Sequence, residues 1–287
     1  MAKVKDRLSS NIPGAFYVDR SCIDCGTCQL LAPDTFDNYE EMARVYRQPH
    51  DPATRIRALM SVLACPVGAI GTTEKADYRT IEAVFPELVD GPVHYCGYHS
   101  SKSFGAASYL ILRPEGNILV DTPRYAKPLL DRIEALGGVD LLFLTHADDV
   151  AEHAKFRKHF GCRRIIHETD ASGVPAEILL KGEEPVRLDE DVTLVPVPGH
   201  TEGSVCLIFR EIYLFSGDHL SWSPERKELQ AFRQACWHSW KSQIASMERL
   251  AGFPFEWVLP GHGARCHFPR QRMTEELAHC IAGMKTA

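Results

Sequence analysis

The sequence contains no apolar run long enough to cross a bilayer and no block of lysine or arginine residues. A membrane-spanning helix needs about 20 mainly apolar residues in a row, so we expect no membrane partner. The formal net charge of -6, without a basic stripe, offers nothing that attracts a phosphate backbone, so nucleic acid is not an expected partner either. The opening residues, MAKVKDRLSS, lead into polar sequence without the apolar centre of a signal peptide, which predicts a cytoplasmic protein.

Internal repeats, low-complexity segments and the glycine-rich fingerprint of flavin or nicotinamide sites are also missing. Apolar residues make up 45% and charged residues 24% of the chain, which is typical of a globular protein with a real core. At roughly 150 residues per domain, 287 residues favour two domains. The sequence turns polar after Ile70 and a new strand pattern begins at Val93, so we expect domains at residues 1–85 and 86–287.

Ten cysteines in a chain of this length do not make a small disulfide scaffold, and clustered cysteines in a reducing cytosol more often bind metal. Four of them lie in the first quarter, at Cys22, Cys25, Cys28 and Cys65. The others are scattered singly, and we expect them to behave as small buried hydrophobic residues: Cys96, Cys162, Cys206, Cys236, Cys266 and Cys280.

The first three cysteines are each separated by two residues, and the fourth is followed by Pro66. This is the thiolate arrangement that holds a cubane iron–sulfur cluster, and Gly26 relieves the crowding in such a tight loop. In the two-cluster bacterial run, a Cys-Pro pair follows the third cysteine, but here Ala32-Pro33 stands there. The sequence therefore predicts one [4Fe-4S] cluster, held by the four clustered cysteines.

The positions that would ligate a second cluster, counted back from Cys65, are also occupied by other residues, namely Ser61, Ala58 and Arg55. Residues 10–75, including the stretch ACPVGAI, resemble a single-cluster bacterial ferredoxin. The resemblance implies a small domain that moves single electrons, although a fused cluster can also be purely structural.

From Val93 onwards, short apolar stretches typical of strands alternate with amphipathic stretches typical of helices. Many strands with helices between them predict two sheets covered by helices. The expected fold class is therefore α+β, with a small ferredoxin-like domain followed by this layered domain.

The stretch LTHADDVAEHAKF, Leu144–Phe156, opens as an apolar strand and then places several metal-binding residue types close together. Three later loops, each straight after an apolar strand, add His200, Asp218 and His262. A loop at a strand end lets a rigid sheet aim the side chain while substrate can still reach it. The sequence therefore predicts a second metal centre.

The motifs around these residues, Thr145-His146, Pro198 to Ser204, Ser216 to Asp218 and Pro260 to Gly263, resemble those of the metallo-β-lactamase superfamily over about residues 90–270. The resemblance implies a four-layer αββα sandwich that usually holds two metals. It further implies that His146 and His200 ligate the first metal, that Asp218 bridges, and that His262 ligates the second.

The opening stretch departs from the family pattern His-x-His-x-Asp-His, because Val150 and Ala151 stand at the Asp-His positions. One interpretation lets Asp148 replace the second histidine, as a glutamate does in flavodiiron proteins, while a helix starting near Asp149 brings Asp149 and His153 onto one face. The other interpretation assumes that two extra residues stand in this stretch, so that Glu152-His153 takes the place of the Asp-His pair of the family pattern.

The first interpretation is favoured, although Asp149 also suits a helix N-cap. The predicted metal ligands are His146, Asp148, Asp149, His153, His200, Asp218 and His262. We expect Glu152 to be solvated and His219 to support the site from behind the ligands. The remaining histidines have no motif and are expected on the surface or in the core: His50, His94, His99, His159, His167, His238, His267 and His279.

The favoured functional interpretation is a metal-dependent hydrolase of an ester, thioester, lactone or phosphoester, with Asp218 and Asp149 as catalytic carboxylates. The cofactors would be the cluster and one or two zinc or iron ions, with a small-molecule substrate. The loop that carries Trp222, Arg226, Trp237 and Trp240 is expected to wall the pocket.

The alternative is a di-iron redox enzyme that acts on oxygen, nitric oxide or a related substrate and receives electrons through the cluster from an external donor. Asp148 favours it, because oxygen ligands suit non-haem iron and manganese. A third interpretation is an electron-transfer or scaffold protein whose metal domain has lost activity.

Overall fold

The structure is a computed structural model that describes residues 2–286. The chain forms two compact units. The first runs up to Asp140 and includes Ala154–Gly161; the second takes Leu141–His153 and the chain from Cys162 onwards. These units group residues that pack closely together, so they do not test the predicted domain boundary near residue 85. Among residues 2–286, no helix combines the length and the apolar character needed to cross a bilayer.

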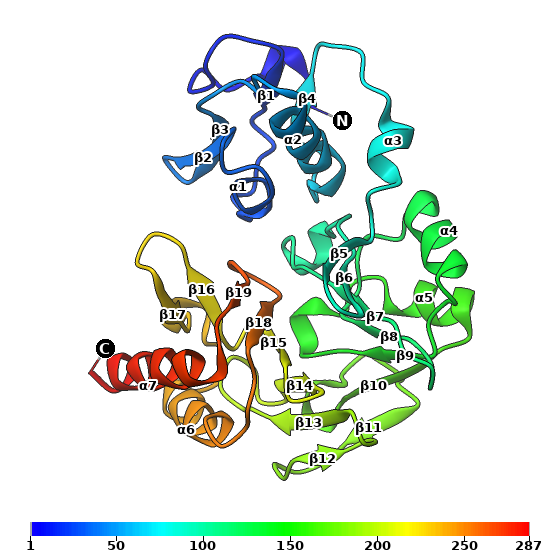
Figure 1. The fold of residues 1–287 in the computed structure, drawn as a ribbon, viewed down its shortest axis with the longest axis vertical. Helices are drawn as coiled ribbons and strands as arrows, with labels where there is room; N and C mark the ends of the chain where they lie inside the picture. Colours follow the sequence, from blue (N-terminus) through cyan, green and yellow to red (C-terminus); the bar gives the residue numbers. More distant parts are fainter. Residues whose placement is uncertain (1, 287) are drawn as a thin grey trace. The chain divides into compact units, whose positions relative to one another are not determined.

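The start of the first unit is built around two small antiparallel pairs of strands (Figure 1). Strand β1 (Phe16–Val18) pairs with β4 (Ile70–Thr72), so the two ends of this segment close on each other. Strands β2 (Phe36–Tyr39) and β3 (Met42–Val45) form a hairpin. The buried side chains of Phe16, Phe36 and Val45 provide an apolar core for this part.

Two helices accompany these strands, α1 (Thr27–Leu31) and α2 (Pro52–Ala64). The Asp51 carboxylate accepts hydrogen bonds from the backbone nitrogens of Ala53 and Thr54, and Pro52 occupies the first turn, where its missing N–H costs nothing. These features fix where α2 begins. Its C-cap is Cys65, so the fourth clustered cysteine leaves a defined helix end.

The rest of the first unit is an antiparallel meander of four strands, in which each strand pairs with the next. The strands are β5 (Glu87–Asp90), β6 (Val93–Tyr95), β7 (Tyr109–Ile111) and β8 (Ile118–Val120). Every residue of β7 and β8 is buried, as expected for strands covered on both faces. The helices of this part are α3 (Tyr78–Glu82), α4 (Lys127–Ala135) and α5 (His153–Phe160).

The second unit contains parallel strands and a mixed sheet. Strands β9 (Leu141–Phe143), β10 (Arg163–His167) and β11 (Ile178–Leu180) run parallel. The mixed sheet follows the order β12 (Val186–Arg187), β13 (Val192–Pro196), β14 (Val205–Phe209), β15 (Tyr213–Gly217), β18 (Trp257–Pro260) and β19 (Cys266–His267). Strands β16 (Ser221–Ser223) and β17 (Glu228–Gln230) form a separate hairpin.

Helices α6 (Trp240–Leu250) and α7 (Arg270–Thr286) cover one face of the mixed sheet (Figure 1). Their apolar side chains, including Met247 and Leu277, join Leu214 and Val258 of the strands in one buried cluster. Burying this apolar surface is the main favourable term that holds the layer together. Strands β15 and β18 are parallel neighbours, so the loops at their carboxyl ends emerge at the same edge.

Replacing Leu214 by alanine should lower the free energy of unfolding by about 2–5 kcal/mol, because the side chain is fully buried in a central strand and a cavity would remain. All four tryptophans lie in the second unit, so denaturant unfolding followed by tryptophan fluorescence reports on it. The matched control is Leu179→Ala, since Leu179 is 45% exposed and should change stability by less than about 0.5 kcal/mol. Equal losses in the two variants would contradict the assigned core.

Candidate metal centres

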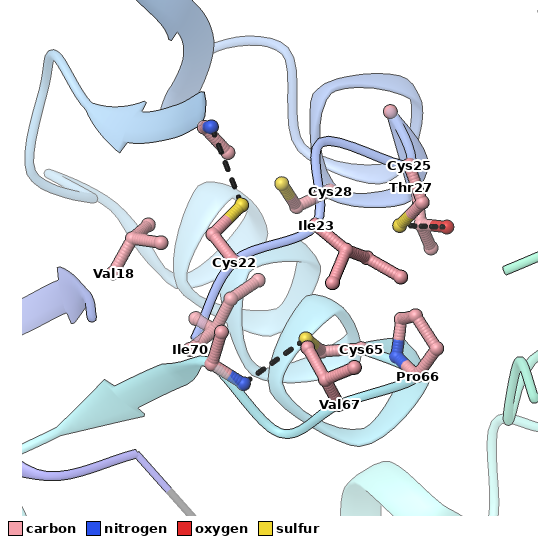
Figure 2. Close-up of a pocket in the computed structure, with 13 residues that line it drawn as sticks. Val18, Cys22, Ile23, Cys25, Thr27, Cys28, Cys65, Pro66, Val67 and Ile70 are labelled. Carbon is pink, nitrogen blue, oxygen red and sulfur yellow. Dashed lines mark hydrogen bonds between the residues drawn. The ribbon is translucent and has the colours of Figure 1, made fainter. Parts of the chain in front are cut away.

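The four clustered cysteines line one pocket in the first unit (Figure 2). Cys22 and Cys25 lie in the loop before α1, Cys28 lies in α1, and Cys65 follows α2. Gly26 has φ 76°, a left-handed conformation that favours glycine and lets the loop turn tightly between two cysteines. Apolar side chains close the pocket, among them Val18, Ile23, Pro66 and Ile70.

Backbone N–H groups donate hydrogen bonds to the sulfur atoms in this pocket (Figure 2). The Ala43 nitrogen lies 3.4 Å from Cys22 Sγ, and the Ala69 nitrogen lies 3.2 Å from Cys65 Sγ. The Thr27 hydroxyl lies 3.3 Å from Cys25 Sγ. Donors of this kind stabilise negative charge on sulfur, as iron–sulfur ligands require.

The pKa values of the cysteine thiols also fit a cluster site. Burial raises the pKa of Cys25 and raises that of Cys28 well above its usual range, and the neighbouring cysteines raise both further. Buried thiols this close together resist ionisation unless a strongly positive group lies between them. An iron–sulfur core supplies that charge, so the four cysteines suit the predicted cluster.

The scattered cysteines are mostly buried, as expected: Cys96, Cys162, Cys206, Cys266 and Cys280 are buried and Cys236 is half-buried. Burial raises the pKa of Cys96 and Cys266 to about 12, so these thiols stay neutral.

The second unit brings five of the predicted ligands into two overlapping groups. The first contains His146, Asp148 and His200; the second contains His146, Asp149 and Asp218. Within each group, one potential ligand atom of every residue lies within 4.8 Å of the others. All five residues lie on loops that follow β9, β13 and β15.

The distances between donor atoms suit a shared cation. Asp218 Oδ2 lies 3.7 Å from Nε2 of both His146 and His200, and Asp148 Oδ2 lies 3.4 Å from His200 Nε2. Donors bound at 2.0–2.2 Å to one tetrahedral metal lie roughly 3.3–3.6 Å apart. Asp149 Oδ2 is 4.0 Å from His146 Nε2.

The histidine rings are held so that Nε2 faces this group. His200 Nδ1 lies 2.5 Å from the carbonyl oxygen of Ala235, which can only accept, so Nδ1 carries the proton and Nε2 keeps its lone pair. The Thr145 hydroxyl lies 2.9 Å from His146 Nδ1. Within residues 2–286, the Nε2 atoms of both histidines are buried and have no hydrogen-bond partner. Buried orphan lone pairs of this kind fit a metal.

The net effect of burial and of the charges in the group is to lower the pKa values of both Asp218 and His146. Burial alone would raise the pKa of Asp218, but His262, His146 and His200 reverse this and hold it well below the usual range. Burial lowers the pKa of His146 despite the nearby Asp218. Metal binding needs carboxylates that are ionised and histidines that are neutral, and the shifts of Asp218 and His146 favour that state. At His200 the effect of burial is outweighed by Asp148 and Asp218, which raise its pKa.

His262 lies beside Asp218, as the resemblance implies. Its Nδ1 is 2.8 Å from Asp218 Oδ2, and its backbone nitrogen donates to Asp218 Oδ1 at 3.1 Å. The preceding Gly261 has no room for a side chain, because a Cβ there would lie 2.8 Å from oxygens of both Asp149 and Asp218. The glycine of this motif is therefore required by the close approach of two carboxylates.

The structure places His153 elsewhere. The expected helix from Asp149 does not form: a 3-10 turn covers Ala147–Asp149, Ala151 has φ 25°, and α5 begins only at His153. Asp149 and His153 therefore do not share a helix face. His153 Nδ1 lies 3.0 Å from Arg164 Nη1, and in the described part of the chain the ligand groups around His146 do not include it.

Of the four side chains that were expected to wall the pocket, only that of Trp237 is seen to contact a predicted ligand in the described part of the chain. Trp237 is 66% exposed, and its indole N–H donates to Asp148 Oδ2 at 3.1 Å. The Trp222 ring packs on Phe268, Trp240 donates to the carbonyl of Met284, and Arg226 donates to Gln230, so these three side chains make other contacts.

Asp170 is a supporting residue that no sequence motif indicates. Its buried carboxylate accepts hydrogen bonds from the Ala147 nitrogen at 2.9 Å, the Gly203 nitrogen at 2.8 Å and the Thr201 hydroxyl at 2.5 Å. It thereby ties the His146 loop to the His200 loop. His219, expected behind the ligands, is buried, and burial together with His200 lowers its pKa to about 3.

Comparison with known families supports the two resemblances. Residues 18–72 match the family model of the 4Fe-4S single cluster domain of Ferredoxin I, and residues 91–281 match that of the metallo-β-lactamase superfamily. The chain has no significant match among curated proteins.

Solved structures share the fold at low identity. A metallo-β-lactamase from Pontibacter korlensis is 19% identical, with a TM-score of 0.51 over 70% of this chain and 98% of that one. One from Hirschia baltica is 16% identical, with a TM-score of 0.53 over 68% of this chain and 96% of that one. The predicted fold class, a ferredoxin-like domain followed by a metallo-β-lactamase sandwich, is thereby confirmed. Because its model spans well over half of the sequence, the chain belongs to the metallo-β-lactamase superfamily, and a single-cluster ferredoxin domain precedes that fold.

Proposed function

We propose that this chain is a metal-dependent hydrolase that cleaves a small ester, thioester, lactone or phosphoester. The observation that supports this most directly is the convergence of the His146 and His200 Nε2 atoms on the Asp218 carboxylate, all within 3.7 Å. Family membership adds support for an enzyme but leaves the reaction class to the site itself.

In the proposed site, one or two zinc or iron ions would be held by His146, Asp148, Asp149, His200, Asp218 and His262. Such an ion would supply a water of lowered pKa and would polarise the scissile bond. Asp218 accepts a hydrogen bond from His262 Nδ1, 2.8 Å away, which orients the carboxylate. Asp149 adds a second carboxylate that can orient the attacking oxygen. His153, whose ring contacts Arg164, is left out of this proposed ligand set.

A second candidate is a redox enzyme supplied with electrons through the cluster. Asp148 favours it, because its oxygen lies 3.4 Å from His200 Nε2 and completes a set of two histidines and one carboxylate with His146. That donor set is typical of non-haem iron. The reaction would need an external one-electron donor.

Replacing His200 by alanine should release metal from the second unit and abolish turnover, because His200 supplies a ligand that no neighbour can replace. We expect a loss of metal affinity beyond the 10- to 100-fold that is usual for residues that only support a ligand. Metal content of the purified variant measures this. His238→Ala is the matched control, since His238 is the exposed neighbouring histidine. Full metal occupancy in the His200 variant would overturn the ligand assignment.

Replacing Asp170 by alanine should weaken metal binding by about 10- to 100-fold, because the two ligand loops lose their shared acceptor. Competition with a chelator of known affinity measures the change. Glu168→Gln, at an exposed position two residues away, should bind metal as the native chain does. An unchanged affinity in a folded Asp170 variant would show that the loops do not need this carboxylate.

Metal analysis and replacement of Cys25 separate the two candidate functions. For the hydrolase, anaerobically purified protein should contain four irons with sulfide and one or two zincs, and a folded Cys25→Ala variant should still hydrolyse substrate. Iron in excess of the cluster, a coupled di-iron signal in the EPR spectrum and loss of turnover in the Cys25 variant would instead favour the redox enzyme.

A further inference from the structure

We call residues 91–140, the part of the metallo-β-lactamase match at the end of the first unit, the metallo-β-lactamase segment. Within the first unit, a chain of polar side chains runs from this segment to Cys25, a predicted ligand of the cluster. Thr27 lies in the ferredoxin match, whereas Tyr95, His99 and Gly105 lie in the metallo-β-lactamase match. Thr27 Oγ1 is 3.3 Å from Cys25 Sγ and 3.2 Å from His99 Nδ1. His99 also contacts the Gly105 carbonyl through Nδ1 and the Tyr95 hydroxyl through Nε2.

The chemistry of these groups fixes the direction of the hydrogen bonds. The Gly105 carbonyl can only accept, so His99 Nδ1 carries the proton. His99 Nε2 then accepts from the Tyr95 hydroxyl, and the Nδ1 proton is shared with Thr27 Oγ1. The Thr27 proton is left to donate. A cluster-bound thiolate is an acceptor, and its negative charge makes it a better partner than the Gly105 carbonyl at 3.4 Å.

The three polar side chains that lead to Cys25 are buried, with 4% exposure at Thr27 and His99 and 5% at Tyr95. In such a low-dielectric setting hydrogen bonds are stronger and polarise one another. Gly105, at φ 88°, lets the backbone approach the cluster ligand, since a Cβ there would lie 3.0 Å from Cys25 Sγ. A side chain at this position would push the segment away.

The same segment also forms hydrogen bonds with the end of α2, next to Cys65. The His99 backbone nitrogen donates to the Ala64 carbonyl at 3.2 Å. The Arg124 guanidinium donates to the carbonyls of Leu63 at 2.7 Å and Cys65 at 3.2 Å. The metallo-β-lactamase segment therefore contacts the surroundings of Cys25 and Cys65 and restrains both.

We propose that His99 is a positioning residue that turns the Thr27 hydroxyl toward Cys25 Sγ and thereby raises the reduction potential of the cluster. Reduction by a low-potential one-electron donor adds one negative charge to the cluster and transfers no proton to the network. A donor to sulfur stabilises the reduced cluster more than the oxidised one. This inference depends on the cluster and is independent of the proposed hydrolytic reaction.

Coupling of this kind is reciprocal. Because the segment stabilises the reduced cluster, reduction must strengthen the interaction of the cluster with His99 and Gly105. The metallo-β-lactamase segment thus responds to the redox state of the cluster, which gives the cluster a regulatory role that does not require electrons to reach the second metal centre.

The test uses the full chain with its cluster, reduced stepwise with dithionite and followed by EPR. Thr27→Val keeps the shape of the side chain but removes the hydroxyl, and should lower the reduced fraction about tenfold at a fixed potential, a shift of about 59 mV for one electron. Thr27→Ser keeps the hydroxyl and should match the native chain. His99→Phe should shift the potential in the same direction, and His94→Phe, a histidine on β6, serves as its control.

Two further outcomes decide the proposal. The double variant Thr27→Val with His99→Phe should shift no further than Thr27→Val alone, because His99 acts through Thr27. Additive shifts, or a native potential in a fully loaded Thr27→Val protein, would overturn it. If the His99→Phe variant does not retain the cluster, the comparison of Thr27→Val with Thr27→Ser decides the proposal. Amide exchange of residues 99–105 should slow on reduction, and equal exchange in both states would refute the reciprocal coupling.

Discussion

The buried lone pairs of neutral histidines and ionised carboxylates that face one another need a cation or a proton between them, and a set of hydrogen bonds in the second unit holds such atoms in place. Asp218, His146 and His200 converge from three different loops, and each is restrained by contacts on its far side. The Ala235 carbonyl sets the tautomer of His200, and Asp170 joins the loops of the two histidines. A metal that binds these donors only in the folded state should contribute directly to the stability of this unit.

Strand topology explains why the site forms where it does. Strands β15 and β18 are parallel neighbours, so Asp218 and His262 leave the sheet at one edge. The glycines before them permit the approach: Gly217 has φ 51°, and Gly261 faces two carboxylates. A Cβ at Gly217 would lie 2.7 Å from Thr145 Oγ1. The backbone must therefore pass close to the His146 loop, and only glycine allows it.

Sequence reasoning predicted the parts that depend on local motifs. The four cysteines converge as their spacing indicated, and His200, Asp218 and His262 follow strands as expected. The position of His153 was not predictable from spacing, because one residue, Ala151, leaves the helical region and removes the assumed i, i+4 relation. Asp170 and His99 were also missed, since each acts through tertiary contacts with residues distant in sequence and neither lies in a motif.

The cluster and the second metal centre are built on the same principle with different ligands. In both, the candidate ligands lie close together in a mostly buried setting, while groups behind them donate or accept hydrogen bonds that hold them in place. The cluster differs in that part of its support comes from the metallo-β-lactamase segment, through His99, Gly105 and Arg124. Through these contacts the charge of a bound cluster can act on the metallo-β-lactamase segment, as the proposed coupling requires, whether or not an electron ever leaves the cluster.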